Sequence, residues 1–298
     1  MPSSSPKPVR CLLVAALSCV LAACGETPAP PAAAAMPAST PEVLATRDAL
    51  PARDAAQTPV GLDGGAVRDY LVSQYGELAQ LQGDWPGTPV ADGLGNAPAS
   101  REICAREAIG SADAPAELVA VCGVPDGAGH VTTALTDFFQ LRLVDGAVVA
   151  DARQHMDSFG SIGDVADVEV RRFGPRLYGF VVEDGFTGQG ITVGNASIVL
   201  PDAGAFHQAG GLRTSLDNLG AMEGCAERDD CAPDAGYDLA FELTVDMRDA
   251  TAAVWPLRVH ERGEACGRRV DRSHAVPFDG AAGAWRVPPA LQRDSGCD

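Results

Sequence analysis

Residues Tyr237 to Val245 read YDLAFELTV, and this stretch decides the fold class. Every second residue, from Tyr237 through Phe241 to Val245, is large and apolar, while small or polar residues occupy the positions between them. Because successive side chains of a strand point to opposite faces of a sheet, this alternation predicts a β-strand with one buried face and one solvent-facing face. A similar alternation over residues 255–260 predicts a partner strand.

Shorter strands are predicted upstream of this pair. They are expected at residues 139–143, 147–152, 165–173, 176–183 and 191–200. Asp145-Gly146 separates the first two, and this dipeptide is typical of a type I′ hairpin turn because both of its residues tolerate a positive φ. Gly174-Pro175 separates the next two, and Asp184-Gly185 with the glycine-rich stretch 185–190 precedes the last.

One helix is expected ahead of the strands. Residues 66–82 carry apolar side chains at helical spacing, including Val67, Leu71 and Leu78. Regular short strands with turn signals favour a sandwich or barrel over alternating βαβ units. The sequence therefore predicts a mainly β domain over residues 62–298, an antiparallel sandwich or barrel-like fold with one N-terminal helix. A further boundary near residues 203–235 stays open.

The first 23 residues have the three parts of a secretory signal. Lys7 and Arg10 supply the positive start, an uncharged apolar run covers residues 11–23, and Ala22-Ala23 leads into Cys24. The run is shorter than the roughly 20 apolar residues of a membrane-spanning helix. A plain signal peptide cut elsewhere and an uncleaved anchor are the alternatives.

Leu21-Ala22-Ala23-Cys24 resembles the lipobox of bacterial lipoproteins, in which Leu and two small residues precede Cys. The resemblance implies cleavage before Cys24, a diacylglyceryl thioether on that cysteine and acylation of the new amino terminus. Such a set of acyl chains is enough for stable anchoring in a membrane. Cys19 fits less well, because Ala16 stands where the lipobox has Leu. Gly25 is similar to the residue that follows the cysteine in enteric lipoproteins sent to the outer membrane.

Residues 24–61 are rich in Ala and Pro, and they predict a lipidated tether. Such a composition has too little apolar surface to build a core, so the segment is expected to stay extended or disordered. A random coil of this length spans roughly 35 Å, enough to hold the folded domain clear of a membrane surface.

Charge excludes several functions. Beyond residue 23 the chain has 20 Arg and no Lys against 40 Asp and Glu, a formal charge of −20, because Lys7 is its only lysine. Without lysine there is no Schiff base and no P-loop. A chain this acidic is repelled by phosphate backbones, so we expect no nucleic-acid partner. Metal cations and basic partners are electrostatically allowed, although solubility alone also explains the charge.

Six further cysteines predict a disulfide set, because an exported protein meets an oxidising compartment. They are Cys104, Cys122, Cys225, Cys231, Cys266 and Cys297. Fifteen pairings are possible for six cysteines, and closeness in the chain favours pairing each with its neighbour in this order. Their spacing does not resemble a zinc site, and a catalytic thiol would need one cysteine to stay unpaired.

Acidic residues gather around Cys225 and Cys231. They are Glu223, Glu227, Asp229, Asp230 and Asp234. Carboxylate oxygens are the ligands that Ca²⁺ prefers, so a calcium site is one interpretation. No EF-hand spacing is present, and a solvated acidic loop is the simpler interpretation. No other cofactor is expected.

Catalytic motifs are absent beyond residue 23: there is no G-x-S-x-G, H-E-x-x-H or S-x-x-K in that part of the chain. The histidines that could still assemble a site are His130, His155, His207, His260 and His274. The carboxylates considered for glycoside hydrolysis are Asp164, Asp167, Glu169, Glu183 and Asp184, which strand alternation and turns explain equally well. Trp85, Trp255 and Trp285 could stack on sugars, but isolated tryptophans of a β domain are usually buried.

These observations favour a lipid-anchored protein of the bacterial cell envelope, at the outer membrane and facing the periplasm or the cell surface. We expect a binding or structural module that takes a protein, a glycan or an ion. A periplasmic or surface hydrolase, with a site built from His, Asp and Glu, is the alternative.

Overall fold

The computed structural model describes residues 58–87, 99–129, 132–160, 163–225 and 232–297. All of them belong to one compact unit. Cys24, the signal segment and the tether up to residue 57 lie outside the described residues.

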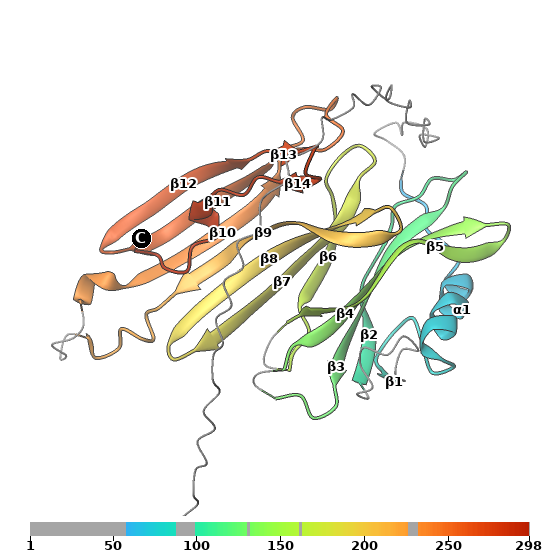
Figure 1. The fold of residues 1–298 in the computed structure, drawn as a ribbon, viewed down its shortest axis with the longest axis horizontal. Coiled ribbons are helices and arrows are strands. Elements are labelled where there is room, and N and C mark those ends of the chain that lie inside the picture. The colour runs from blue at the N-terminus through green and yellow to red at the C-terminus, as the bar shows by residue number, and fades with distance from the viewer. Residues whose placement is uncertain (1–57, 88–98, 130–131, 161–162, 226–231, 298) are drawn as a thin grey trace, which may run out of the picture. The chain divides into compact units, whose positions relative to one another are not determined.

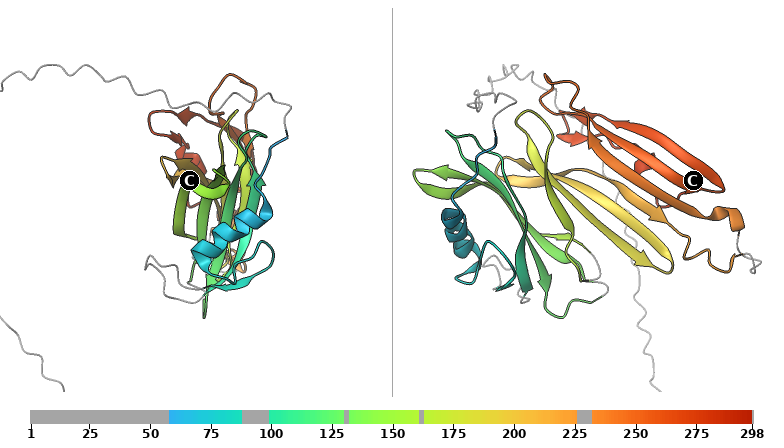
Figure 2. Two further views of the ribbon diagram at one scale, coloured as in Figure 1. Left: turned by 90° about the vertical axis from the view of Figure 1, so that its right-hand side faces the viewer. Right: turned by 180° about the vertical axis from the view of Figure 1, so that it is seen from behind.

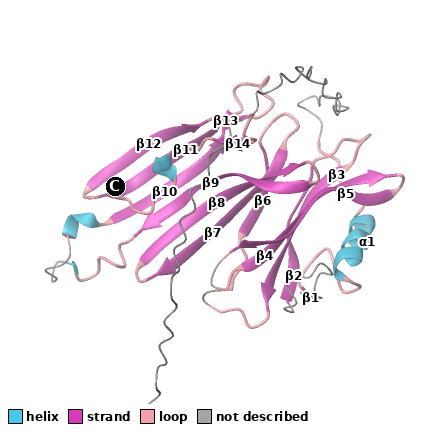
Figure 3. Cartoon of the chain, viewed as in Figure 1, coloured by secondary structure: helices cyan, strands magenta, loops and turns pink. Residues whose placement is uncertain are grey.

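The described chain is mainly antiparallel β-sheet with one α-helix near its N-terminal end, as predicted (Figures 1 and 3). The elements of the first half are α1 Gly64–Tyr75, β1 Trp85–Gly87, β2 Ala99–Ala108, β3 Ala116–Pro125, β4 Ala134–Val144, β5 Ala147–Phe159 and β6 Asp167–Arg172. Those of the second half are β7 Tyr178–Gly188, β8 Ile191–Asp202, β9 Ala205–Asp217, β10 Tyr237–Val245, β11 Leu257–Ala265, β12 Arg268–Val276, β13 Phe278–Asp279 and β14 Ala284–Trp285. Each predicted strand overlaps one of these strands.

The strands form two large sheets and one small one. A five-stranded sheet has the order β1-β2-β3-β4-β5, a seven-stranded sheet has the order β12-β11-β10-β9-β8-β7-β6, and β13 pairs with β14. Every strand therefore pairs with its neighbour in the sequence, always antiparallel, so each sheet is a simple meander. Strands β9 and β10, which flank residues 218–236, pair with each other in the seven-stranded sheet.

Tight turns join many of these strands. Asp145-Gly146 has φ values of 49° and 81° between β4 and β5, which confirms the predicted hairpin turn. The same pair of positive φ values occurs at Gln189-Gly190, Ala203-Gly204 and Cys266-Gly267. Asp184-Gly185 makes no turn, because β7 continues through both residues to Gly188.

Helix α1 is shorter than predicted and ends at Tyr75 instead of residue 82. Asp63 caps its start, where its carboxylate accepts the Ala66 backbone N–H at 3.1 Å. Gly76 adopts φ 88° and donates its N–H to the Val72 carbonyl, which ends the helix. Leu78 continues the apolar pattern of the sequence beyond this stop, yet its side chain is 59% exposed.

The two large sheets pack face to face as a sandwich. Phe138 of β4 fills the space between them, with its ring centroid 4.8 Å from that of Phe180 in β7 and 5.8 Å from that of Phe206 in β9. Helix α1 covers the other face of the five-stranded sheet through Leu71 and Tyr75, and Figure 2 shows it lying across those strands.

A third core lies on the far face of the seven-stranded sheet. Leu239 and Phe241 of β10, together with Val259 of β11, pack there against Trp285 and Leu291 of the C-terminal segment. The alternation of YDLAFELTV thus buries the side chains that it was expected to bury.

Two disulfides confirm the predicted pairing. Cys104–Cys122 links β2 to β3, and Cys266–Cys297 links the turn between β11 and β12 to the C-terminal end, with Cα–Cα distances of 5.7 and 5.5 Å. Cys225 is also disulfide-bonded, and its predicted partner Cys231 lies outside the described residues.

Candidate functional site

A buried cluster of polar side chains, here called the Asp137 cluster, lies between α1 and the five-stranded sheet. The carboxylate of Asp137 is fully buried. Tyr75 donates its hydroxyl to Oδ2 of Asp137 at 2.5 Å, and the same oxygen lies 3.3 Å from Nη1 of Arg101 and 3.5 Å from Nδ1 of His155. A buried carboxylate is costly unless it is paired and hydrogen-bonded, and Tyr75 and Arg101 meet that need.

The sheet places each member of the cluster. Arg101 in β2 stands opposite Gly123 in β3, where a Cβ would lie 3.3 Å from the Arg101 Cγ, so the glycine leaves room for the long side chain. The register between β4 and β5 shifts beside Asp137, and this bulge brings His155 next to it.

Aromatic rings enclose the cluster. The Arg101 guanidinium lies over the Tyr75 ring at 5.1 Å, and Trp85 packs against the same ring with centroids 6.1 Å apart. Burial raises the pKa of Tyr75, and the negative charge of Asp137 raises it further, so the phenol stays a proton donor.

Three nitrogen atoms of this region are buried without a hydrogen-bond partner: Nε1 of Trp85, Nε of Arg101 and Nδ1 of His155. His155 faces a carboxylate, as the base of a hydrolase does, but no serine, threonine or cysteine among the described residues is hydrogen-bonded to it. The cluster therefore contributes to the attachment of α1 to the sheet.

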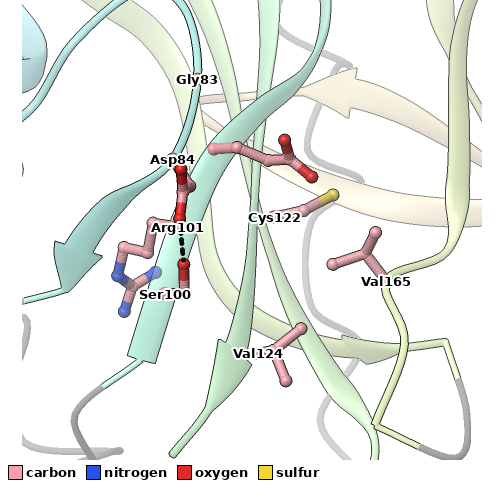
Figure 4. Close-up of a pocket in the computed structure, with 8 residues that line it drawn as sticks. Gly83, Asp84, Ser100, Arg101, Cys122, Val124 and Val165 are labelled. Atoms are coloured by element: carbon pink, nitrogen blue, oxygen red, sulfur yellow. Dashed lines mark hydrogen bonds between the residues drawn. The ribbon is translucent and has the colours of Figure 1, made fainter.

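A hollow of about 390 Å³ borders β2 on its other face (Figure 4). Ser100 donates its hydroxyl to Asp84 at 3.3 Å at one side of the hollow, and Cys122 and Val165 line the other. The Arg101 side chain points away from Cys122 and Val165, toward the opposite side of the strand (Figure 4). Arg101 is shared by the two, because it lines the hollow and also pairs with Asp137.

A second hollow, here called the polar groove, measures about 370 Å³. It is lined by Ser158, Phe159, Asp184, Asn195, Ala196, Ser197, Gln208, Gly211, Leu212, Arg213 and Gln292. Val182 of β7 belongs to the core between the sheets, and Asp184 follows two residues later on the same face. The polar groove thus begins where the five-stranded sheet stops covering the seven-stranded sheet.

A row of polar side chains crosses three strands in this groove. Asp184 of β7 stands opposite Asn195 of β8, which stands opposite Arg213 of β9. Asn195 donates its amide N–H to Oδ1 of Asp184 at 3.5 Å and accepts a hydrogen bond from Nη1 of Arg213. The Gly160 backbone N–H donates to Oδ2 of Asp184 at 3.2 Å. These bonds fix the orientation of all three side chains.

Gly211 keeps the neighbouring part of the groove open. It stands opposite Ser197, and a Cβ on it would lie 2.9 Å from Nε2 of Gln208. That amide nitrogen donates to the Ser197 hydroxyl at 3.0 Å, which gives the groove a second hydrogen-bonded pair beside the first row.

The C-terminal segment forms one wall of the groove. Gln292 donates to the Gly211 carbonyl at 3.0 Å, and Arg213 donates its Nε–H to the Arg293 carbonyl at 2.9 Å. Asp294 forms an ion pair with Nη2 of Arg213. The wall therefore depends on the position of residues 292–294.

Arg293 is in turn held by the buried carboxylate of Glu261. Nη2 of Arg293 lies 2.6 Å from Oε1 of Glu261, and Nε2 of His274 lies 2.7 Å from Oε2. Burial alone would raise the pKa of Glu261, but the hydrogen bonds from Arg293 and His274 outweigh it and lower this pKa.

The structure places the predicted histidines apart from one another. His207 contacts the Gly283 carbonyl at 3.1 Å, and His260 contacts Asp271 at 2.9 Å on the surface. His130 lies outside the described residues. Each described histidine therefore pairs with a different carboxylate or carbonyl.

Of the predicted carboxylates, only Asp184 enters the polar groove. Asp164, Asp167, Glu169 and Glu183 are exposed, and Asp167 stands opposite Glu183 in the pairing of β6 with β7. Most of the residues considered for calcium lie outside the described part of the chain. Asp234 and Glu223 are exposed, Glu227, Asp229 and Asp230 lie outside the described residues, and no described group of three such ligands could hold a metal.

The tryptophans form no sugar-stacking surface. Trp85, Trp255 and Trp285 are all buried. The indole of Trp255 donates to the Asp249 carbonyl at 2.9 Å, and that of Trp285 donates to the Trp255 carbonyl at 3.1 Å. The glycine-rich stretch 185–190 forms the end of β7 and its turn.

The polar groove was missed at the sequence level because its residues are far apart in the chain. A polar residue at each of Asn195 and Ser197 within an otherwise apolar strand was the available signal. No protein-family model, curated protein or solved structure matches this chain. Within the described residues, no helix has both the length and the apolar character that a membrane span requires.

Proposed function

We propose that this chain is a lipid-anchored protein of the bacterial cell envelope, held at the outer membrane through Cys24, whose β domain binds a glycan in the polar groove. The assignment of a glycan as ligand rests on the row of Asp184, Asn195 and Arg213. These hydrogen-bonding side chains occupy the face of the seven-stranded sheet that is apolar in the core between the sheets. They lie where the five-stranded sheet no longer covers that face.

The chemistry of the row suits sugars. A sugar hydroxyl both donates and accepts a hydrogen bond, and carboxylate, amide and guanidinium groups side by side offer both functions. Their mutual hydrogen bonds orient them before a ligand arrives, which lowers the entropic cost of binding. Phe159 adds an apolar wall, and such a mixture of apolar surface with a few placed polar groups is typical of small-molecule sites.

Binding is favoured over hydrolysis by the number of carboxylates. Glycosidases use two carboxyl groups about 5–10 Å apart. Asp184 is the only acidic side chain among the described residues that line the groove, and hydrogen bonds from Gly160 and Asn195 engage both of its oxygens.

The binding proposal is tested by calorimetric titration of the mature chain with envelope-derived oligosaccharides. Asn195→Ala should weaken binding by about tenfold or more, because it removes the amide that orients Asp184 and Arg213. Gly211→Val should have an effect of similar size, because the new side chain fills the groove. Gln82→Ala, at an exposed position outside the groove, is the control and should bind like the wild type. Wild-type affinity in both groove variants would refute the assignment of the groove.

Anchoring is tested separately. In a bacterial host, Cys24→Ala should abolish incorporation of a labelled fatty acid and move the protein from the membrane fraction to the soluble fraction. Cys19→Ala is the matched control and should change neither. Labelling that survives Cys24→Ala would disprove lipidation at this cysteine.

A further inference from the structure

Arg213 carries the only positive charge among the described residues that line the polar groove. The mature chain is strongly acidic and has no lysine, so arginines supply its permanently positive side chains. The side chain of Arg213 is 18% exposed, and it reaches the groove from β9.

Protein groups already orient the Arg213 guanidinium. Nε donates to the Arg293 carbonyl at 2.9 Å, and Nη1 donates to the side-chain carbonyl of Asn195. These two partners fix the plane of the guanidinium and leave Nη2 as its third donor. Nη2 is paired with the carboxylate of Asp294.

The Asp294 carboxylate is held weakly. Its side chain is 91% exposed, and exposed ion pairs contribute little because water and salt screen them. A guanidinium binds any carboxylate in the same geometry, so a ligand carboxylate could replace that of Asp294. Asp294 would then return to solvent with almost no loss of burial.

The one acidic residue of the groove does not oppose such a ligand strongly. Asp184 is neutralised in part by the Gly160 N–H and the Asn195 amide, and Asn195 lies between its carboxylate and Arg213. The positive end of the row is therefore the Arg213 end, beside the C-terminal wall.

From this geometry we infer that the ligand of the polar groove is an acidic glycan, a sugar chain whose carboxylate binds Arg213 in place of the carboxylate of Asp294. The inference rests on the proposed function and names the class of glycan. Asp294 is then a built-in competitor that occupies the carboxylate position while the groove is empty.

The test uses matched disaccharides that differ only in a carboxylate, namely cellobiouronic acid with cellobiose and digalacturonic acid with galactobiose. Each is titrated against the mature chain by calorimetry. For the better-bound pair, the acidic member should bind at least about tenfold tighter than the neutral one, as expected for a charge-assisted contact. Asp294→Asn should strengthen binding of the acidic sugar only, and Arg213→Gln should remove the preference for it.

Each outcome decides between the two proposals. Equal binding of the acidic and neutral members would overturn the inference and leave the glycan groove in place. Binding of no disaccharide would count against the glycan groove itself. Asp294→Asn is expected to fold like the wild type, because this side chain is almost fully exposed. An unchanged affinity for the acidic sugar in that variant would show that Asp294 does not compete with the ligand.

Discussion

Replacing Asp137 with leucine should destabilise the domain by about 3–5 kcal/mol, because the change leaves the guanidinium of Arg101 buried without a counter-charge. The side chain of Arg101 is 2% exposed, and Asp137 is its only ion-pair partner among the described residues. Tyr75 would lose a hydrogen-bond acceptor in the same change. Urea unfolding followed by tryptophan fluorescence measures the loss, and Trp85 reports on the cluster because it packs against Tyr75.

The double variant Asp137→Leu with Arg101→Met should recover most of this loss. Removing both charges still takes the Asp137 acceptor away from Tyr75, which costs about 1–3 kcal/mol. Arg142 and Asp151 form a matched control on the surface, where their side chains are 48% and 36% exposed. Removing that pair should cost at most about 1 kcal/mol. Equal losses of stability in Asp137→Leu and in the double variant would refute the reasoning. So would a loss in Asp137→Leu as small as that measured for the surface pair.

Three further changes test other parts of the fold. Phe138→Ala should cost about 3–5 kcal/mol in urea unfolding, because this ring fills the core between the sheets, whereas Phe186→Ala, at a position 54% exposed, should cost less than about 1 kcal/mol. Joint replacement of Cys104 and Cys122 by serine should lower stability by about 3 kcal/mol, since the disulfide closes a loop of 18 residues; wild-type stability would show that it constrains nothing. The pKa of Glu261 is lowered on folding, although burial alone would raise it, because two basic neighbours hydrogen-bond its carboxylate. The ionised Glu261 carboxylate therefore contributes its full stabilisation above the unfolded pKa of about 4.3, and this stabilisation is lost as the pH falls through the pKa of the folded state. Glu261→Gln should consequently flatten the acid limb of a plot of melting temperature against pH.

The sequence was most informative where one face of a strand is buried and the other meets water. YDLAFELTV shows that alternation, and β10 has the expected buried face. Strand β3 shows none, because residues 118–122 are all buried between the second sheet on one side and α1 on the other. A strand buried on both faces reads as a plain apolar run, which periodicity alone does not distinguish from a helix.

The candidate sites were less predictable than the strands. Nothing in the sequence around Arg101 or Asp137 indicates that these charges meet in the interior, since they come from different strands and α1 closes over them. The polar groove likewise combines β5, β7, β8, β9 and the C-terminal segment. Disulfide pairing was predictable because partners are close in the chain, 18 and 31 residues apart.

The meander of both sheets has a consequence for how the chain reaches its fold. Within each sheet, every strand after the first pairs with the strand immediately before it in the sequence, so the sheets can extend in the order in which the chain emerges from a translocation channel or a ribosome. Pairing between neighbours gives a low contact order, and low contact order is associated with fast folding. Strands β6 to β9 need only close over the sheet already formed by β1 to β5, and β10 to β12 can be added one hairpin at a time. The last strand of each sheet has an unpaired edge while the chain is being made. No later strand, however, has to insert between two strands that are already paired.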